Sequence, residues 1–138
     1  MVVTKLKKSV RQLVEEAEAE ISTLSTDEVQ ILLDSEEGTL FDIRDVRELW
    51  REGTIPGAVH TPRGMLEFWA DPESPYHREI FASGKQLVFY CASAWRSALA
   101  TKALQDMGVP NVAHMAGGFS KWKELNLPIN PVEKNRRC

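Results

Sequence analysis

The chain has 138 residues, a usual length for one globular domain, and 43% of them are hydrophobic and 27% charged. Its net charge of −3, with both signs interspersed, gives no basic field of the kind that binds nucleic acids. The apolar runs are far too short for a membrane span, and the charged stretch 5–20 lacks the apolar segment of a signal peptide. We therefore expect a cytoplasmic protein with neither nucleic acid nor membrane as a partner.

The cysteines and histidines give no sign of a structural cross-link or a metal site. Cys91 and Cys138 are far apart in the sequence, and Cys138 ends a polar tail, so no structural disulfide is expected. His60, His77 and His114 form no Cys-x-x-Cys or His-x-x-x-His pair, so no metal site is expected. Cys91 is the cysteine of interest, and a resolving role for Cys138 is a minor alternative.

An amphipathic helix is predicted over residues 1–20, because apolar residues recur there at steps of three and four. Such a helix would lie on the domain, or it would pair with a second copy of the chain to form a homodimer. The segment has fewer than three heptads, so the pattern gives little support to the homodimer. Residues 21–130 are expected to form one domain, followed by a flexible basic tail at 131–138.

Short apolar segments alternate with helical ones from residue 21 onward. Strands are predicted at residues 39–43, 58–60, 87–90 and 112–115. Helices are predicted at residues 25–33, where a capping box opens the helix, at 45–50, within 65–82, at 97–107 and at 119–125. This alternation predicts an α/β fold of three layers, α/β/α, with a mostly parallel central sheet of about five strands.

The most informative segment joins the predicted strand 87–90 to the helix 97–107, at the end of the sheet where α/β proteins bind ligands. Small residues in its first half let the backbone curl so that successive N–H groups converge, and the helix N-terminus adds positive potential. The segment therefore predicts an anion-binding nest. Its predicted substrate-binding residues are Ala92, Ser93, Ala94, Trp95, Arg96 and Ser97.

Cys91 lies at the floor of this nest, where a cysteine should be held largely as the thiolate. Arg96 is expected to place a positive charge at the rim that forks onto an oxyanion, and the Ser97 hydroxyl to hydrogen-bond the sulfur. We therefore predict that Cys91 is a catalytic nucleophile that takes a group from an oxyanionic donor. The alternative is a buried, inert cysteine at a strand end.

Other polar side chains are candidates for the surroundings of this loop. Arg63 is a possible residue of the pocket rim, with a solvated arginine as the alternative. His60 and His114 are interpreted as satisfied core or rim histidines rather than acids or bases. A structural ion-pair and capping cluster beside the site is predicted for Asp42, Arg44 and Glu48.

Four motifs in a fixed order carry a resemblance to a known family. They are Phe41-Asp42-Ile43-Arg44 with Glu48-Leu49-Trp50, Ile55-Pro56-Gly57-Ala58, Cys91-x-x-x-x-Arg96-Ser97, and Gly117-Gly118-Phe119 with Trp122 and Leu127-Pro128-Ile129. Together they resemble the rhodanese homology domain over about residues 21–129. Three positions depart from the family pattern. Thr54 replaces a frequent histidine and is read as a turn residue, Ala94 replaces a frequent glycine, which a positive φ would penalise, and Trp95 is unusually bulky.

The resemblance implies a sulfurtransferase without a cofactor. A sulfane sulfur from a small anion such as thiosulfate would be carried as a Cys91 persulfide and passed to cyanide or a thiol. One alternative is a cysteine-dependent phosphatase or arsenate reductase of the same fold. Those phosphatases need five residues between cysteine and arginine, whereas four separate Cys91 from Arg96. The other alternative is a non-catalytic regulatory module, against which the presence of Cys91, Arg96 and Ser97 argues.

Overall fold

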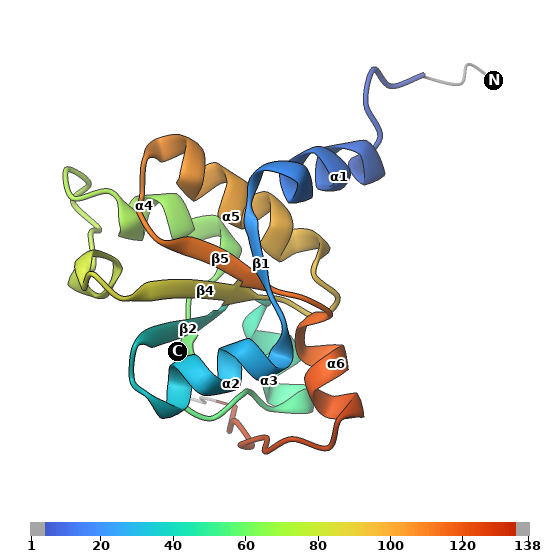
Figure 1. Ribbon diagram of the computed structural model, residues 1–138, viewed down its shortest axis with the longest axis vertical. Coiled ribbons are helices and arrows are strands. Elements are labelled where there is room, and N and C mark those ends of the chain that lie inside the picture. Colours follow the sequence, from blue (N-terminus) through green and yellow to red (C-terminus); the bar gives the residue numbers. More distant parts are fainter. Residues whose placement is uncertain (1–4, 135–138) are drawn as a thin grey trace.

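A computed structural model describes residues 5–134, built around a five-stranded parallel sheet (Figure 1). The strand order is β1-β5-β4-β2-β3. The strands are β1 (Ser22–Leu24), β2 (Gly38–Asp42), β3 (Val59–His60), β4 (Gln86–Tyr90) and β5 (Val112–Met115). The α-helices are α1 (Val10–Glu20), α2 (Thr26–Asp34), α3 (Val46–Glu52), α4 (Leu66–Ala70), α5 (Trp95–Met107) and α6 (Gly118–Glu124). Two short 3₁₀-helices are η1 (Arg63–Met65) and η2 (Glu79–Ala82).

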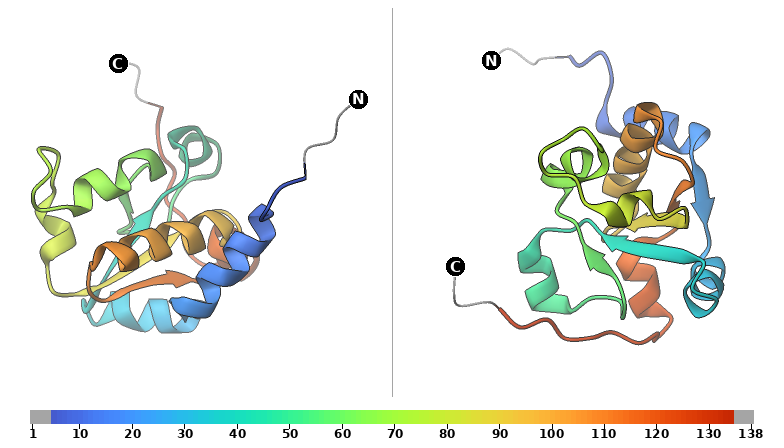
Figure 2. Two further views of the ribbon diagram at one scale, coloured as in Figure 1. Left: turned by 90° about the horizontal axis from the view of Figure 1, so that it is seen from above. Right: turned by 90° about the vertical axis from the view of Figure 1, so that its left-hand side faces the viewer.

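Helices cover both faces of the sheet and make it the middle of three layers (Figure 2). One face carries α1, α4 and α5, and the other carries α2, α3 and α6. Along β4, Leu87 and Phe89 pack into the core on the α5 side, while Val88 and Tyr90 pack into the opposite core. The strand reads as a continuous apolar run because it is buried on both faces. The predicted fold class is confirmed.

The N-terminal helix packs on α5 of the same chain. Val14 and Ala17 of α1 are buried against Ala98, and the Gln105 side chain donates to the Glu20 carbonyl at 2.8 Å. The helix starts later than predicted, because a capping box at residue 9 opens it at residue 10. Residues 1–4 lie outside the described part of the chain. The homodimer is not tested and stays a prediction.

Three further details differ from the sequence prediction. The edge strand β1 was not predicted, and α5 begins at Trp95 rather than at residue 97. The last helix, α6, begins at Gly118 rather than at residue 119, with Gly117 as its N-cap. Of the predicted tail, residues 131–134 have no regular secondary structure, and residues 135–138, including Cys138, lie outside the described part. No helix between residues 5 and 134 is long and apolar enough to cross a membrane.

Candidate functional site

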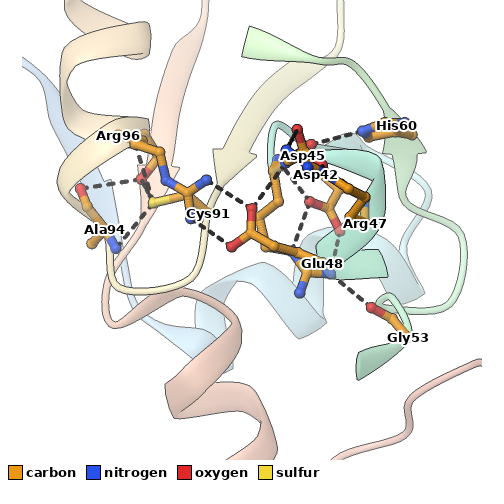
Figure 3. Close-up of polar contacts among 11 residues, drawn as sticks. Asp42, Asp45, Arg47, Glu48, Gly53, His60, Cys91, Ala94 and Arg96 are labelled. Carbon is orange, nitrogen blue, oxygen red and sulfur yellow. Dashed lines mark hydrogen bonds and ion pairs between the residues drawn. The ribbon is translucent and has the colours of Figure 1, made fainter. Parts of the chain in front are cut away.

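Cys91 directly follows β4, the middle strand, at the carboxyl end of the sheet. Only 1% of the residue is exposed. Its Sγ accepts the backbone N–H groups of Ala94 at 3.2 Å and Ser97 at 3.3 Å (Figure 3). Two N–H groups of the predicted nest therefore converge on the sulfur, an arrangement that stabilises negative charge at that point.

Ala94 makes the turn that brings these N–H groups together. Its backbone is left-handed, with φ at +83° and ψ at −6°. An alanine in this conformation costs about 1 kcal/mol relative to glycine. The turn ends the loop, and α5 starts at the next residue, Trp95. The departure from the family pattern at position 94 therefore strains the loop without removing its turn.

The first turn of α6 holds the other half of the loop. The Phe119 and Ser120 N–H groups donate to the carbonyls of Cys91 and Ala92, at 2.8 and 3.0 Å. Gly118 permits this approach, since its φ is +58° and a Cβ there would lie 2.5 Å from the Cys91 carbonyl oxygen. The glycine-rich motif is thus explained by the close packing of α6 against the cysteine loop.

Ser97 connects the sulfur to a buried histidine. Its Oγ lies 3.6 Å from Cys91 Sγ and 2.9 Å from His114 Nδ1, and it donates to the Ala94 carbonyl at 3.2 Å. Burial lowers the pKa of His114 to about 4, so the imidazole is neutral at pH 7. The sequence interpretation treated His114 as a satisfied histidine, but it did not place the ring behind the cysteine loop.

Arg96 lies in the first turn of α5, and its guanidinium is paired within the protein. Nη1 and Nη2 donate to the two carboxylate oxygens of Glu48, at 2.8 and 3.0 Å (Figure 3). The hydrogen bond between them lowers the pKa of Glu48 and raises that of Arg96, so both remain charged at pH 7. The sequence predicts that this fork binds an oxyanion. The structure instead shows it on a carboxylate of α3.

Asp42 and Arg44 form a fully buried ion pair beside the start of the loop, with 2.7 Å between Arg44 Nη2 and Asp42 Oδ2. The same oxygen accepts the hydroxyl groups of Tyr90 and Thr54. Burial, together with the charge of Asp42, raises the pKa of Tyr90. Since Tyr90 is the residue before Cys91, this cluster fixes the point where the loop leaves the sheet.

The remaining candidates each have a contact of their own within the protein. Trp95 is half-exposed, and the guanidinium of Arg11 lies 6.0 Å from its ring centroid, so α1 reaches the cysteine loop. Arg63 belongs to η1 and pairs with the glutamate one turn later at 2.8 Å. His60 Nε2 lies 2.8 Å from the backbone carbonyl of Arg44.

A shallow charged hollow adjoins the loop, which also exposes Ser93. The hollow is lined by Asp45, Arg47, Glu48, Arg51 and Arg96. Three arginines against two carboxylates give it a net positive charge. A larger cavity lies at the opposite end of β4, between η2 and the end of α5. Within residues 5–134, no three side chains are grouped so that they could hold a metal ion.

Fold and site together define an α/β domain in which a tight loop holds one buried cysteine at the carboxyl end of a parallel sheet. Residues 25–125 match the family model of the rhodanese-like domain. The chain therefore belongs to the rhodanese-like domain family, as the four motifs implied.

Three relatives illustrate the range of the family. A protein of unknown function from Rhodopseudomonas palustris, called a possible tyrosine phosphatase, is 44% identical, with a TM-score of 0.89 over 94% of this chain and 100% of that one. The human thiosulfate:glutathione sulfurtransferase is 32% identical over 108 residues, 74% of this chain and 93% of the relative. A sulfurtransferase from Allochromatium vinosum is 31% identical over 100 residues, 72% of this chain and 85% of the relative.

Sequence reasoning missed the roles of two polar side chains near the loop. Thr54 was read as a turn residue, yet its hydroxyl binds Asp42, twelve residues earlier in the chain. Nothing local in the sequence indicates that contact. For His114 a signal did exist, because it follows Val112 at the two-residue spacing that directs both side chains to the α5 side. A polar residue at such an inward position indicates a buried partner.

Proposed function

We propose that the protein is a sulfurtransferase that carries a sulfane sulfur as a persulfide on Cys91. The observation that carries this proposal is the pair of N–H groups, from Ala94 and Ser97, directed at Cys91 Sγ. The same loop would stabilise the negative terminal sulfur of a persulfide, since backbone N–H groups act as a preorganised anion site. The human and Allochromatium vinosum relatives, both called sulfurtransferases, support this assignment.

In the first half-reaction, the Cys91 thiolate attacks the sulfane sulfur of thiosulfate. A bond forms between Sγ and that sulfur, and the sulfur–sulfur bond of thiosulfate breaks. Sulfite leaves with the electron pair, and Cys91 keeps the outer sulfur as a persulfide anion. The positive charge of the hollow beside the loop favours a small anionic donor of this kind.

In the second half-reaction, a nucleophilic acceptor attacks the outer sulfur of the persulfide. Cyanide takes it as thiocyanate, and a thiol takes it as a new persulfide, with the Cys91 thiolate restored in both cases. The two half-reactions share one enzyme form and predict ping-pong kinetics. A cytoplasmic setting suits the cycle, because thiols stay reduced there.

The rival function is that of a cysteine-dependent phosphatase, the class named for the Rhodopseudomonas palustris relative. Four residues separate Cys91 from Arg96, one fewer than such a phosphatase needs. The fork of Arg96 lies on Glu48, whereas a phosphatase would direct it at the phosphate. Both observations favour transfer of a single sulfur atom.

One preparation distinguishes the two functions. Thiocyanate formation from thiosulfate and cyanide is measured beside the hydrolysis of an aryl phosphate, for the wild type and for Cys91→Ser. We expect cyanide-dependent turnover in the wild type, none in Cys91→Ser, and negligible phosphate release in both. Phosphate release that depends on Cys91, without thiocyanate formation, would reverse the assignment.

A further inference from the structure

A continuous chain of side chains leads from the buried sulfur of Cys91 to the protein surface. Ser97 Oγ lies 3.6 Å from Sγ, and His114 Nδ1 lies 2.9 Å from Ser97 Oγ. On the other side of the ring, Nε2 lies 3.1 Å from Thr23 Oγ1. Cys91, Ser97 and His114 are each at most 1% exposed, whereas Thr23 is exposed on the edge strand β1.

Strand register explains why these side chains meet. Thr23 and His114 are direct partners in the β1–β5 ladder, so their side chains point to the same face of the sheet. That face is covered by α5, whose first turn carries Ser97.

The Cys91 thiol, which contacts the His114 ring through Ser97, is a titratable group on this path. Burial alone lowers the pKa of His114, with no charged side chain of the described residues acting on the ring.

The hydrogen on the Ser97 hydroxyl has several possible acceptors. These are the Cys91 sulfur, the Ala94 carbonyl at 3.2 Å, and Nδ1 of His114 whenever that nitrogen is unprotonated. The Ala94 carbonyl also receives the Ala98 N–H at 3.1 Å, so it does not depend on Ser97. The tautomer of His114 therefore decides whether Nδ1 competes with the sulfur for the Ser97 hydrogen.

We propose that His114 is a positioning residue for Cys91: while Cys91 is a thiolate, Thr23 holds the ring in the tautomer that donates from Nδ1 to Ser97, which reserves the Ser97 hydrogen for the sulfur. This inference rests on the proposed role of Cys91 as the sulfur carrier. The Thr23 hydroxyl donates to Nε2, which leaves the ring hydrogen on Nδ1. Nδ1–H then donates to Ser97 Oγ, and the Ser97 hydroxyl donates to the thiolate, a stronger acceptor than the Ala94 carbonyl that it contacts in the structure.

The same chain accounts for the proton that a Cys91 thiol must lose. In the thiol form, S–H donates to Ser97, the Ser97 hydroxyl donates to Nδ1, and Nε2–H donates to Thr23. One hydrogen then passes along each link, and the original Thr23 hydroxyl hydrogen leaves to solvent at β1. One proton is released, the sulfur becomes a thiolate, every hydrogen bond reverses, and the imidazole ends neutral.

The test compares two substitutions of His114. Asparagine places an amide near the position of Nδ1 and still donates to Ser97, whereas leucine has similar bulk and no donor. We measure the rate of Cys91 alkylation by iodoacetamide against pH, which does not depend on sulfur transfer. His114→Leu should move the pH midpoint of alkylation upward by about one unit, which makes alkylation about tenfold slower below the midpoint. His114→Asn should bring the midpoint most of the way back to the wild-type value.

Two further variants separate this role from a loss of packing. Thr23→Val removes only the exposed end of the chain and should move the midpoint in the same direction as His114→Leu, by a smaller amount. His77→Leu is the matched control, since that ring contacts the Trp69 carbonyl in another part of the domain and should leave the midpoint unchanged. Equal shifts in both His114 variants, or none in His114→Leu and Thr23→Val, would overturn the proposal.

Kinetics of the first half-reaction complete the test. His114→Leu should lower kcat/KM for thiosulfate about tenfold at a pH below the wild-type midpoint and by less above it, because the ring acts on the sulfur rather than on the donor. A wild-type protein that transfers no sulfur would refute the proposed function, while the alkylation profile would still decide the role of His114.

Discussion

Arg96 and Glu48 are joined by two parallel hydrogen bonds, at 2.8 and 3.0 Å, that tie the first turn of α5 to α3. Arg96 is the one arginine of the cysteine loop, so its charge is partly neutralised where an anionic donor would approach. Glu48 also accepts the Asp45 backbone N–H at 2.9 Å, which caps α3. The carboxylate therefore has two hydrogen-bond partners, and its charge also acts on the buried Arg44.

Replacing Glu48 by glutamine should release Arg96 toward the donor while an amide oxygen still caps α3. We expect Glu48→Gln to lower KM for thiosulfate about fivefold. This factor corresponds to roughly 1 kcal/mol, the interaction of one charge near the surface with the anionic donor. Steady-state kinetics at fixed ionic strength provide the measurement. Glu52→Gln, on the same helix, is the control and should change KM little. A raised KM in Glu48→Gln would mean that Arg96 needs Glu48 in order to hold the loop.

Gly118→Ala should uncouple α6 from the cysteine loop. The added Cβ would meet the Cys91 carbonyl at 2.5 Å, and φ there is +58°, so the loop or the helix must move. We expect sulfur transfer to fall at least tenfold. Gly57→Ala is the matched control: its φ is +83° but a Cβ would meet nothing within 4 Å, so it should cost about 1 kcal/mol of stability and no activity. Similar activity in the two variants would contradict this account of α6.

Ala94→Gly should relieve the strain of the left-handed turn. With φ at +83° at this position, we expect the free energy of unfolding to rise by about 1 kcal/mol. The gain is reduced by the greater entropy that glycine gives the unfolded chain. Urea unfolding followed by circular dichroism measures it. If Ala94→Gly were less stable than the wild type, the surrounding contacts, rather than the backbone, would dominate at this position.

Acid should destabilise the protein through His114. Burial lowers its pKa to about 4 in the folded chain, against 6.5 for the ordinary side chain. Below pH 6.5 the unfolded chain therefore binds a proton that the folded chain does not. The free energy of unfolding therefore decreases as the pH is lowered from about 6.5 to about 4. Urea titrations should show about 1.6 kcal/mol more loss between pH 6.5 and roughly 5 in the wild type than in His114→Leu. His77→Leu should match the wild type, and an equal loss in His114→Leu would remove His114 as the cause.

The sequence predicted those parts of the fold that depend on local patterns. The run at residues 87–90 marked β4 because a strand buried on both faces is apolar throughout. Helix α5 ends at Met107, as predicted, and Gly108 caps it in the left-handed conformation. The edge strand β1 was missed, since Ser22 and Thr23 are exposed and three residues carry no usable period. Its identity as a strand comes from pairing with β5, a contact about 90 residues away in the sequence.

The candidate site divides in the same way. The position of Cys91 and the small residues after it are local features, and they predicted a loop whose N–H groups reach the sulfur. The pairing of Arg96 with Glu48 spans 48 residues, and the packing of His114 behind Ser97 depends on strand register. Both are tertiary contacts. Residue type alone therefore predicted that Arg96 binds the oxyanionic substrate and that His114 is only a satisfied histidine.

The persulfide on Cys91 is tested most directly by the mass of the intact protein. After incubation with thiosulfate and removal of the excess, the wild type should gain the mass of one sulfur atom and lose it again on addition of cyanide. Cys138→Ser should behave like the wild type, and Cys91→Ser should gain nothing. A wild type without the added sulfur, or a Cys91→Ser protein that still acquires it, would contradict the assignment of Cys91 as the sulfur carrier.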